Sequence, residues 1–305
     1  ATAAAPFSAP SLYAAAEVVR QGQCTRCSTV MQTQQLVLST IIGMWRYAAL
    51  SMEGARLSEV QVLFSNLVLA TAFIGFIGAR AVLPMSKERA PGSLFEKSIL
   101  VSTLGQAMIH LAVLRAAVAL SRAAMGPAAL RELWDFQERA RAAAAAQSFD
   151  FATMVKDGGA LSLFSSPFMP NLLNSSVFYV EVMQGLAVLL VNYKGRPWMR
   201  AASENLPLLI VSVVVLAAVG CGVVGWPPRA LELLQLTPLP PRLRAQVGGL
   251  LAATLLGTYA LDRGAEALLS PSRARARREA PLVLADVRPV ARGAVAAAAR
   301  LAPAL

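Results

Sequence analysis

The sequence predicts an all-α membrane protein, a polytopic helical bundle of about six transmembrane helices with both ends in the cytosol. Apolar residues make up 56% of the 305 residues and charged residues only 15%, whereas soluble domains carry about 25% charged residues. Residues 60–79 and 206–226 contain no charged side chain, and each stretch reaches the roughly 20 residues that a helix needs to cross the hydrocarbon core. Lysine and arginine are unevenly divided among the connections, which predicts the orientation.

Four further apolar stretches, each with a few polar or charged residues, complete the predicted set of spans. They are residues 31–50, 98–120, 172–193 and 245–269. Arg46 and Arg115 lie near enough to the predicted helix ends for their long side chains to reach the membrane interface. The other interpretation of such stretches is buried core helices of a soluble protein, and the two uncharged stretches weigh against it.

The predicted organisation places a membrane domain between two cytosolic segments. Residues 1–28 form a cytosolic entry segment, residues 29–269 the six-helix membrane domain, and residues 270–305 a basic, Ala-rich cytosolic tail. The connections placed in the cytosol hold 16 Lys and Arg residues, and those on the opposite side hold 9. The longest non-cytosolic loop, 121–171, contains a predicted surface helix at 130–146. This charge bias fits an even number of spans.

Composition and motifs argue against several other classes of function. The net charge of +11 comes from short basic segments beside apolar stretches, without the grooves of a nucleic-acid surface, so we expect no nucleic acid and take the lipid bilayer as partner. Cys24 and Cys27 form a single C-x-x-C pair, whereas zinc needs four ligands. The one histidine, His110, lies in an apolar stretch, where a hydrogen bond between helices is expected. No phosphate-binding loop or catalytic triad can be built, so no metal or cofactor is expected in this chain.

Polar side chains at membrane depth are the candidates for a functional site, because they are costly there unless they have partners. Glu181 is the first of these, and we expect it to face the bundle interior or a wet cavity, with Gln184 on the same helix face. Ser39, Ser65 and Asn66 mark mid-span positions of two other predicted helices. These five residues are the candidates for a transport pathway. The alternative interpretation is that they only form hydrogen bonds between helices.

Seven short motifs, most of them between or beside the predicted spans, occur in a familiar order. They are residues 5–7 (APF), 19–25 (VRQGQCT), 52–54 (MEG), 86–89 (SKER), 174–177 (NSSV), 192–199 (NYKGRPWM) and 204–208 (ENLPL). Together they resemble the last six membrane helices of the P5A-type P-type ATPases, the dislocases of transmembrane helices in the endoplasmic reticulum. The resemblance covers roughly residues 5–265, and the NYKG-x-P loop is its most specific part.

The resemblance implies a function that the residues themselves do not reveal. It implies the membrane transport part of an ATP-driven pump that extracts misinserted hydrophobic helices from the endoplasmic-reticulum membrane, with ATP and Mg²⁺ acting in catalytic domains. The family's DKTG phosphorylation motif, its actuator motif and its GDG-x-ND motif do not occur in these 305 residues. We therefore expect a carboxy-terminal fragment that is not catalytic alone. Ser39 stands where relatives carry asparagine, and Glu181 has no match in the family pattern.

The alternative function is a stand-alone six-span channel, carrier or membrane scaffold without coupling to ATP. The coding sequence upstream of Ala1 discriminates between the two interpretations. An in-frame DKTG and GDG-x-ND would establish the ATPase, and a nearby start codon would exclude it.

Overall fold

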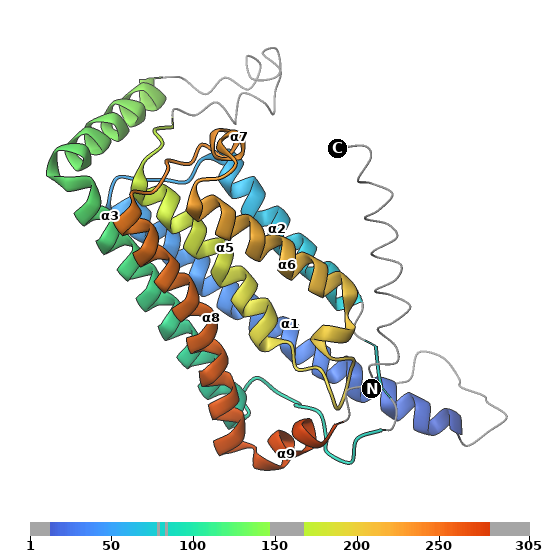
Figure 1. The fold of residues 1–305 in the computed structure, drawn as a ribbon. Helices are drawn as coiled ribbons and strands as arrows, with labels where there is room; N and C mark the ends of the chain where they lie inside the picture. The colour runs from blue at the N-terminus through green and yellow to red at the C-terminus, as the bar shows by residue number, and fades with distance from the viewer. Residues whose placement is uncertain (1–12, 78–79, 83–84, 147–167, 281–305) are drawn as a thin grey trace, which may run out of the picture.

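The protein folds into a bundle of long helices that lie side by side along one direction (Figure 1). The computed structural model describes residues 13–77, 80–82, 85–146 and 168–280. The long helices are α1 (Tyr13–Met52), α2 (Glu59–Ile77), α3 (Lys97–Ala146), α5 (Leu172–Asn192), α6 (Leu206–Val224) and α8 (Pro241–Leu269). Three short helices connect or follow them, namely η2 (Ala202–Glu204), α7 (Pro228–Leu233) and α9 (Pro271–Glu279). Within the described ranges no strand forms beyond the isolated Ala81–Met199 bridge, so the predicted all-α fold is confirmed there.

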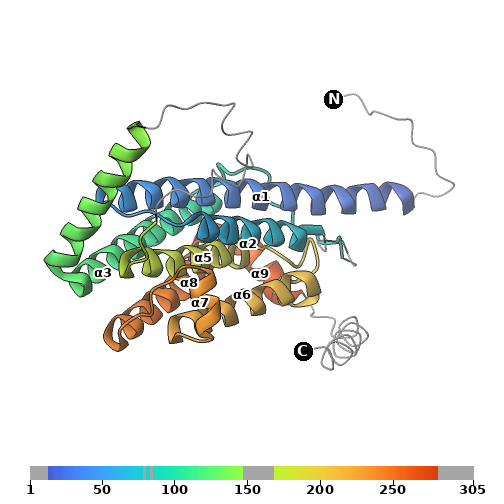
Figure 2. The same cartoon turned by 90° about the horizontal axis from the view of Figure 1, so that it is seen from above.

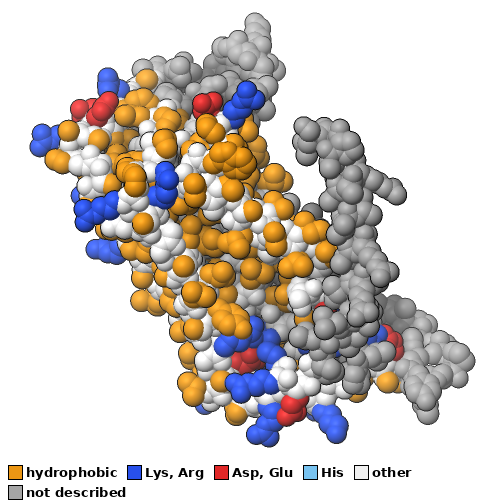
Figure 3. All heavy atoms as spheres, viewed as in Figure 1, with side chains coloured by type: hydrophobic (Ala, Val, Ile, Leu, Met, Phe, Trp, Pro, Cys, Tyr) orange, Lys and Arg blue, Asp and Glu red, His pale blue; other side chains and the backbone are white. Residues whose placement is uncertain are grey.

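Helix α5 is the centre of the bundle, and the other long helices surround it. Of its 21 residues 17 are buried, and it contacts α1, α2, α3, α6 and α8. Helix α6, by contrast, lies at the outside and exposes large apolar side chains, including Leu209, Ile210, Val213, Val214 and Leu216. In the face shown in Figure 3, hydrophobic side chains cover the middle and charged ones gather toward the two ends. This distribution is typical of a protein whose middle contacts lipid.

Three helices in the described part of the chain are long and apolar enough to cross a membrane. They are Lys97–Ala143, Leu172–Asn192 and Leu206–Val224. The remaining three predicted spans correspond to α1, α2 and α8, and the count of six stays a prediction. In α1 and α8 the polar side chains Gln34, Gln35 and Asp262 are buried against neighbouring helices, so their polarity lowers the hydropathy without facing the surroundings.

Successive helices alternate in direction, so the segments predicted to be cytosolic meet at one end of the bundle. The start of α1, the α2–α3 connection, the α5–α6 connection and α9 all lie at the lower end in Figure 1. Helix α1 has 40 residues, which makes it about 60 Å long, roughly twice the thickness of the hydrocarbon core. Figure 2 shows its N-terminal end projecting beyond the other helices.

The predicted connection after residue 120 differs from the structure. The predicted span 98–120 and the surface helix 130–146 are parts of α3, which changes direction where Gly126 takes a φ of 75° and Pro127 follows. Proline supplies no N–H for the preceding turn and glycine tolerates a positive φ, so the helix bends there. The predicted tail begins with α9, which contacts α8 but has no buried residue. The rest of the 121–171 loop to residue 167, residues 281–305 of the tail and residues 1–12 lie outside the described residues.

Asn174 organises the start of α5. Its side chain accepts a hydrogen bond from the N–H of Asn171, and the Asn171 side chain accepts one from the N–H of Asn174, which makes a reciprocal cap. The Nδ2 of Asn174 also donates to the Oε1 of Gln61 on α2 at 3.1 Å. Gln61 in turn donates to the carbonyl oxygen of Leu234 at 2.9 Å. The NSSV motif therefore joins α5 to α2 and to the α7–α8 connection, and its buried asparagine is closed to glycosylation.

Replacing Asn174 with Ala should destabilise the protein by about 1–3 kcal/mol, because the buried N–H of Asn171 and groups around Gln61 lose hydrogen bonds. Ser176 is the matched control: it is equally buried, but its Oγ has no partner among the described residues. Ser176→Ala should change the stability by less than about 0.5 kcal/mol. Thermal unfolding in detergent micelles measures both, and equal effects would contradict the role assigned to Asn174.

Candidate functional site

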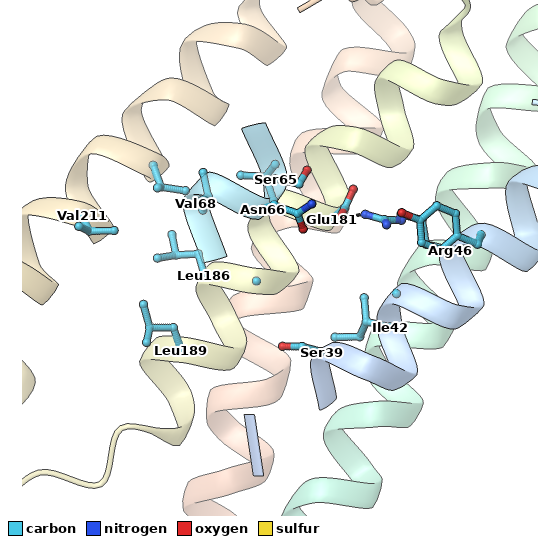
Figure 4. A pocket seen from close by; sticks show the side chains of 15 residues that line it. Ser39, Ile42, Arg46, Ser65, Asn66, Val68, Glu181, Leu186, Leu189 and Val211 are labelled. Atoms are coloured by element: carbon cyan, nitrogen blue, oxygen red, sulfur yellow. Dashed lines mark ion pairs between the residues drawn. The ribbon is translucent and has the colours of Figure 1, made fainter. Parts of the chain in front are cut away.

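A cavity of about 250 Å³ lies between α1, α2, α5 and α6. Four of the five predicted site residues line it: Ser39 from α1, Ser65 and Asn66 from α2, and Glu181 from α5. Figure 4 shows them around one space, although they are up to 142 positions apart in the sequence. Apolar side chains complete the wall, among them Ile42, Val68, Leu186, Leu189, Val211 and Val215. The cavity is therefore polar on one part of its wall and apolar on the other.

Glu181 forms an ion pair with Arg46 inside this cavity. The Arg46 side chain is 8% exposed and that of Glu181 is 14% exposed, so the interpretation of Arg46 as a residue reaching out to the membrane interface was wrong. The guanidinium carbon of Arg46 also lies 4.2 Å from the centroid of the Tyr47 ring, a distance at which a cation and an aromatic face attract. The Arg46 side chain points into the bundle toward the carboxylate of Glu181, because a single unpaired charge at this depth costs more free energy than the ion pair.

Several polar atoms of the cavity residues have no partner among the described residues. They are the Oγ of Ser65, the Nε of Arg46 and the Oε2 of Glu181. Buried polar atoms in folded proteins are nearly always hydrogen-bonded to protein or to water, and a cavity with several such atoms can hold water. The arrangement thus offers one donor, one acceptor and one hydroxyl to whatever occupies the space.

Gln184 does not line the cavity, contrary to the prediction that it shares the face of Glu181. Its side chain is fully buried, and its Nε2 donates to the carbonyl oxygen of His110 on α3 at 2.8 Å. Three residues further along a helix the direction turns by about 60°, which here is enough to point the side chain at α3. Gln184 therefore forms a hydrogen bond between helices. This is the alternative interpretation that the sequence left open for the polar residues at membrane depth. The ring of His110 is buried, and its nitrogens have no partner within the described residues.

A second polar cluster lies toward the other end of α5 and was missed by the sequence analysis. The Nζ of Lys194 is 2.9 Å from the Oδ1 of Asp262, and the Oγ of Ser102 donates to the same oxygen at 2.7 Å. Both charged side chains are at most 6% exposed. The pair joins the connection after α5 to α8 and α3. A signal was present, because Lys194 and Asp262 both lie near the predicted cytosolic ends of spans.

Paired amides extend this cluster. The Nε2 of Gln106 donates to the Oδ1 of Asn192 at 3.0 Å, and the Nδ2 of Asn192 donates to the Oε1 of Gln106 at 3.0 Å. Gln106 also donates to the Oγ of Ser102 at 2.8 Å. The NYKG motif therefore supplies Asn192 and Lys194 to one continuous network that holds α3, α5 and α8 together.

The connection after NYKG is held by a second ion pair. Arg196 and Glu204 form three contacts between 2.7 and 3.1 Å. Burial works against ionisation of Glu204, but hydrogen bonds from Arg196 and from the N–H of Ala201 outweigh it and lower the pKa of that carboxyl. The indole N–H of Trp198 donates to the carbonyl oxygen of Glu88 at 2.9 Å, so this connection is also fixed to the one between α2 and α3.

Lys194→Met should destabilise the protein by about 3–5 kcal/mol, because Asp262 would stay buried without its hydrogen-bonded counter-ion and would keep only the more distant Arg263 at 3.8 Å. The double variant Lys194→Met, Asp262→Leu should regain most of that loss, since both charges are then gone. Glu53 is the control: it pairs with Arg122, whose side chain is 52% exposed, and Glu53→Gln should cost at most about 1 kcal/mol. Chemical unfolding in micelles measures the three; a double variant no better than the single one would contradict this account.

Comparison with known proteins identifies relatives along most of the chain, although no family model matches it. The chain is 23% identical over 275 residues to an endoplasmic reticulum transmembrane helix translocase of Aspergillus fumigatus, covering 90% of this chain and 19% of the relative. It is 26% identical over 266 residues to the Schizosaccharomyces pombe translocase of the same name, covering 85% and 19%. A protein of Arabidopsis thaliana named a probable manganese-transporting ATPase is 25% identical over 249 residues, covering 80% and 18%.

The chain thus spans about a fifth of the length of these curated relatives. Two of the seven motifs that resemble the P5A-type ATPases lie at the two ends of the central helix: NSSV is in the first turn of α5, and NYKG supplies the network at its other end. Over most of its length the chain is similar to the endoplasmic reticulum transmembrane helix translocases, and it corresponds to a carboxy-terminal part of these much longer proteins.

Proposed function

We propose that this chain is the membrane transport part of an ATP-driven translocase that removes misinserted transmembrane helices from the endoplasmic-reticulum membrane. The observation that carries the proposal is the cavity between α1, α2, α5 and α6, with an ion pair on one side and an apolar wall on the other. A passenger helix carries both apolar side chains and a polar end, so a path for it needs both kinds of surface. The relatives that bear the translocase name support this reading.

The size of the cavity sets a requirement on the mechanism. A helix with its side chains is about 10 Å across, and a space of about 250 Å³ accommodates only a few side chains of it. The cavity must therefore enlarge during transport. The Arg46–Glu181 pair joins α1 to α5 across this space, so separating α1 from α5 requires that the pair opens. A passenger that offers a new partner to either charge would lower the cost of opening.

Helix α1 is the element that suits coupling to ATP hydrolysis. It carries Ser39 and Arg46 at the cavity and continues beyond the bundle at its N-terminal end (Figure 2). A single rigid helix can transmit a displacement from one end to the other. ATP and Mg²⁺ would be held by residues outside this sequence, and the part assigned to this chain is to change the cavity when α1 moves. The projecting end of α1 is then cytosolic, together with α9.

The manganese-transporting name of the Arabidopsis relative raises a divalent cation as a second cargo. A divalent cation prefers oxygen ligands that are free to coordinate it. In this cavity the carboxylate of Glu181 is already paired with a guanidinium, and Arg46 would repel a metal ion that came near. The cavity therefore favours a hydrophobic helix over a metal ion as passenger.

Glu181→Gln in the full-length ATPase should lower substrate-stimulated ATP hydrolysis by about tenfold, the value of one charge-assisted hydrogen bond, with normal expression. Arg46→Gln should act in the same direction, and the double variant, which lacks both charges, should also express normally and stay as impaired in substrate-stimulated ATP hydrolysis as either single variant. Glu53→Gln, which alters a paired carboxylate outside the cavity, is the control and should leave activity unchanged. Unchanged transport in Glu181→Gln would reduce the pair to a structural contact and remove the proposed path.

A further inference from the structure

A second cavity, of about 730 Å³, lies at the end of the bundle where α8, α9 and the connection after α5 meet. It is separate from the cavity that contains Glu181. Five basic side chains line it, namely Lys194, Arg196, Arg263, Arg277 and Arg278, together with one carboxylate, that of Glu266. Helix α9 lies across this end of the bundle in Figure 1.

The acidic residues near this cavity do not balance the basic ones. Asp262 pairs with Lys194, and Glu204 pairs with Arg196. Glu266 is shared, because Arg263 approaches it at 3.3 Å and Arg277 at 2.9 Å. The five cations thus face three carboxylates.

Arg278 adds to this excess of positive charge. Its side chain is exposed at the cavity and has no ion-pair partner in the part of the chain that the structure describes. The Nε of Arg277 is buried and likewise has no hydrogen-bond partner among those residues. The exposed guanidinium group of Arg278 is therefore open to an anion that enters the cavity.

We infer that this cavity binds a phosphate group. Guanidinium groups offer paired N–H donors that match phosphate oxygens, and several arginines around one space are typical of phosphate sites. Leu190 and Ala267, at the ends of predicted spans, and the ring of Tyr259 line the same cavity, which places it at the depth where lipid headgroups lie. Basic pockets between membrane helices at the cytosolic side bind anionic headgroups. The phosphate can come from an anionic phospholipid or from solution, and the two sources are distinguishable.

Binding would tie the end of the chain to the bundle. Arg277 already donates to the carbonyl oxygen of Lys194, and a phosphate held by Arg263 and Arg278 would add a bridge from α8 to α9. Lys194, which pairs with Asp262, lines the same cavity. An occupied site should therefore stabilise the network that holds α3, α5 and α8 together. This inference does not depend on the transport role of the other cavity.

The test is lipid retention by the purified chain in nanodiscs of phosphatidylcholine with added phosphatidic acid, read by native mass spectrometry. The wild-type chain should retain phosphatidic acid, and Arg278→Gln should reduce retention about tenfold through loss of one charge-assisted hydrogen bond. Arg275 is the matched control, because it is exposed on the same helix but lines a neighbouring cavity. Arg275→Gln should retain as much lipid as the wild type.

Inorganic phosphate added to the same nanodiscs distinguishes the source. If millimolar phosphate leaves phosphatidic acid in place, the ligand is the lipid headgroup; if phosphate displaces it, the site takes phosphate from solution as well. Both outcomes support a phosphate site, provided that Arg278→Gln abolishes the effect. Retention that is equal in Arg278→Gln, Arg275→Gln and the wild type, or no retention at all, would overturn the inference. Thermal unfolding of the two variants confirms that both are folded, since neither side chain has a partner to lose in the described residues.

Discussion

The fold depends on one constraint, which is that polar groups inside a membrane bundle must find partners within the bundle because lipid offers none. This constraint applies most strongly to helix α5, since it is surrounded by the other long helices. Two of its polar residues lie at its ends, where Asn174 reaches α2 and Asn192 reaches α3. In its middle, Glu181 pairs with Arg46 on α1 and Gln184 donates to the carbonyl oxygen of His110 on α3. Between these ends its buried side chains are largely apolar and pack against five helices. The central helix is thus fixed at both ends by hydrogen bonds and in the middle by close packing.

The cavity is one of the places where this rule is only partly satisfied, and it brings several atoms without partners around a single space. Arg46 and Glu181 neutralise each other, yet an atom of each, and the hydroxyl of Ser65, is left without a partner in the described residues. At the ends of α5 the asparagines and Lys194 have partners at 2.8–3.1 Å. The contrast separates residues that hold the bundle together from residues that are available to water or a passenger.

The sequence predicted the parts of the fold that depend on hydropathy, and missed those that depend on which residues meet. Helices α2, α5 and α6 coincide with predicted stretches to within two residues, because a long run of apolar residues can be recognised from the sequence alone. Ser39, Ser65, Asn66 and Glu181 could be selected because polar residues at mid-span are unusual. The partner of Glu181 could not be predicted, since Arg46 is 135 positions away in the sequence. Its position near a predicted helix end indicated a side chain that reaches the membrane interface. Gln184 was predicted to share the face of Glu181, because its spacing along the helix gives the direction of its side chain only approximately. Lys194 was recognised as part of the NYKG motif, but its ion pair with Asp262 was not predicted.

The proposed transport path requires that the cavity between α1, α2, α5 and α6 contains water. The accessibility of single cysteines to a water-soluble reagent measures this directly. In a chain with Cys24, Cys27 and Cys221 replaced by Ala, Ser39→Cys and Ser65→Cys would be treated in proteoliposomes with a charged, membrane-impermeant thiol reagent, with both faces exposed. Such reagents attack thiolates, which form in water and not in hydrocarbon. The account predicts that both cysteines react, whereas Gln184→Cys, buried against α3, stays unmodified. Protection of Ser39→Cys and Ser65→Cys to the level of Gln184→Cys would contradict a water-filled path between α1, α2 and α5.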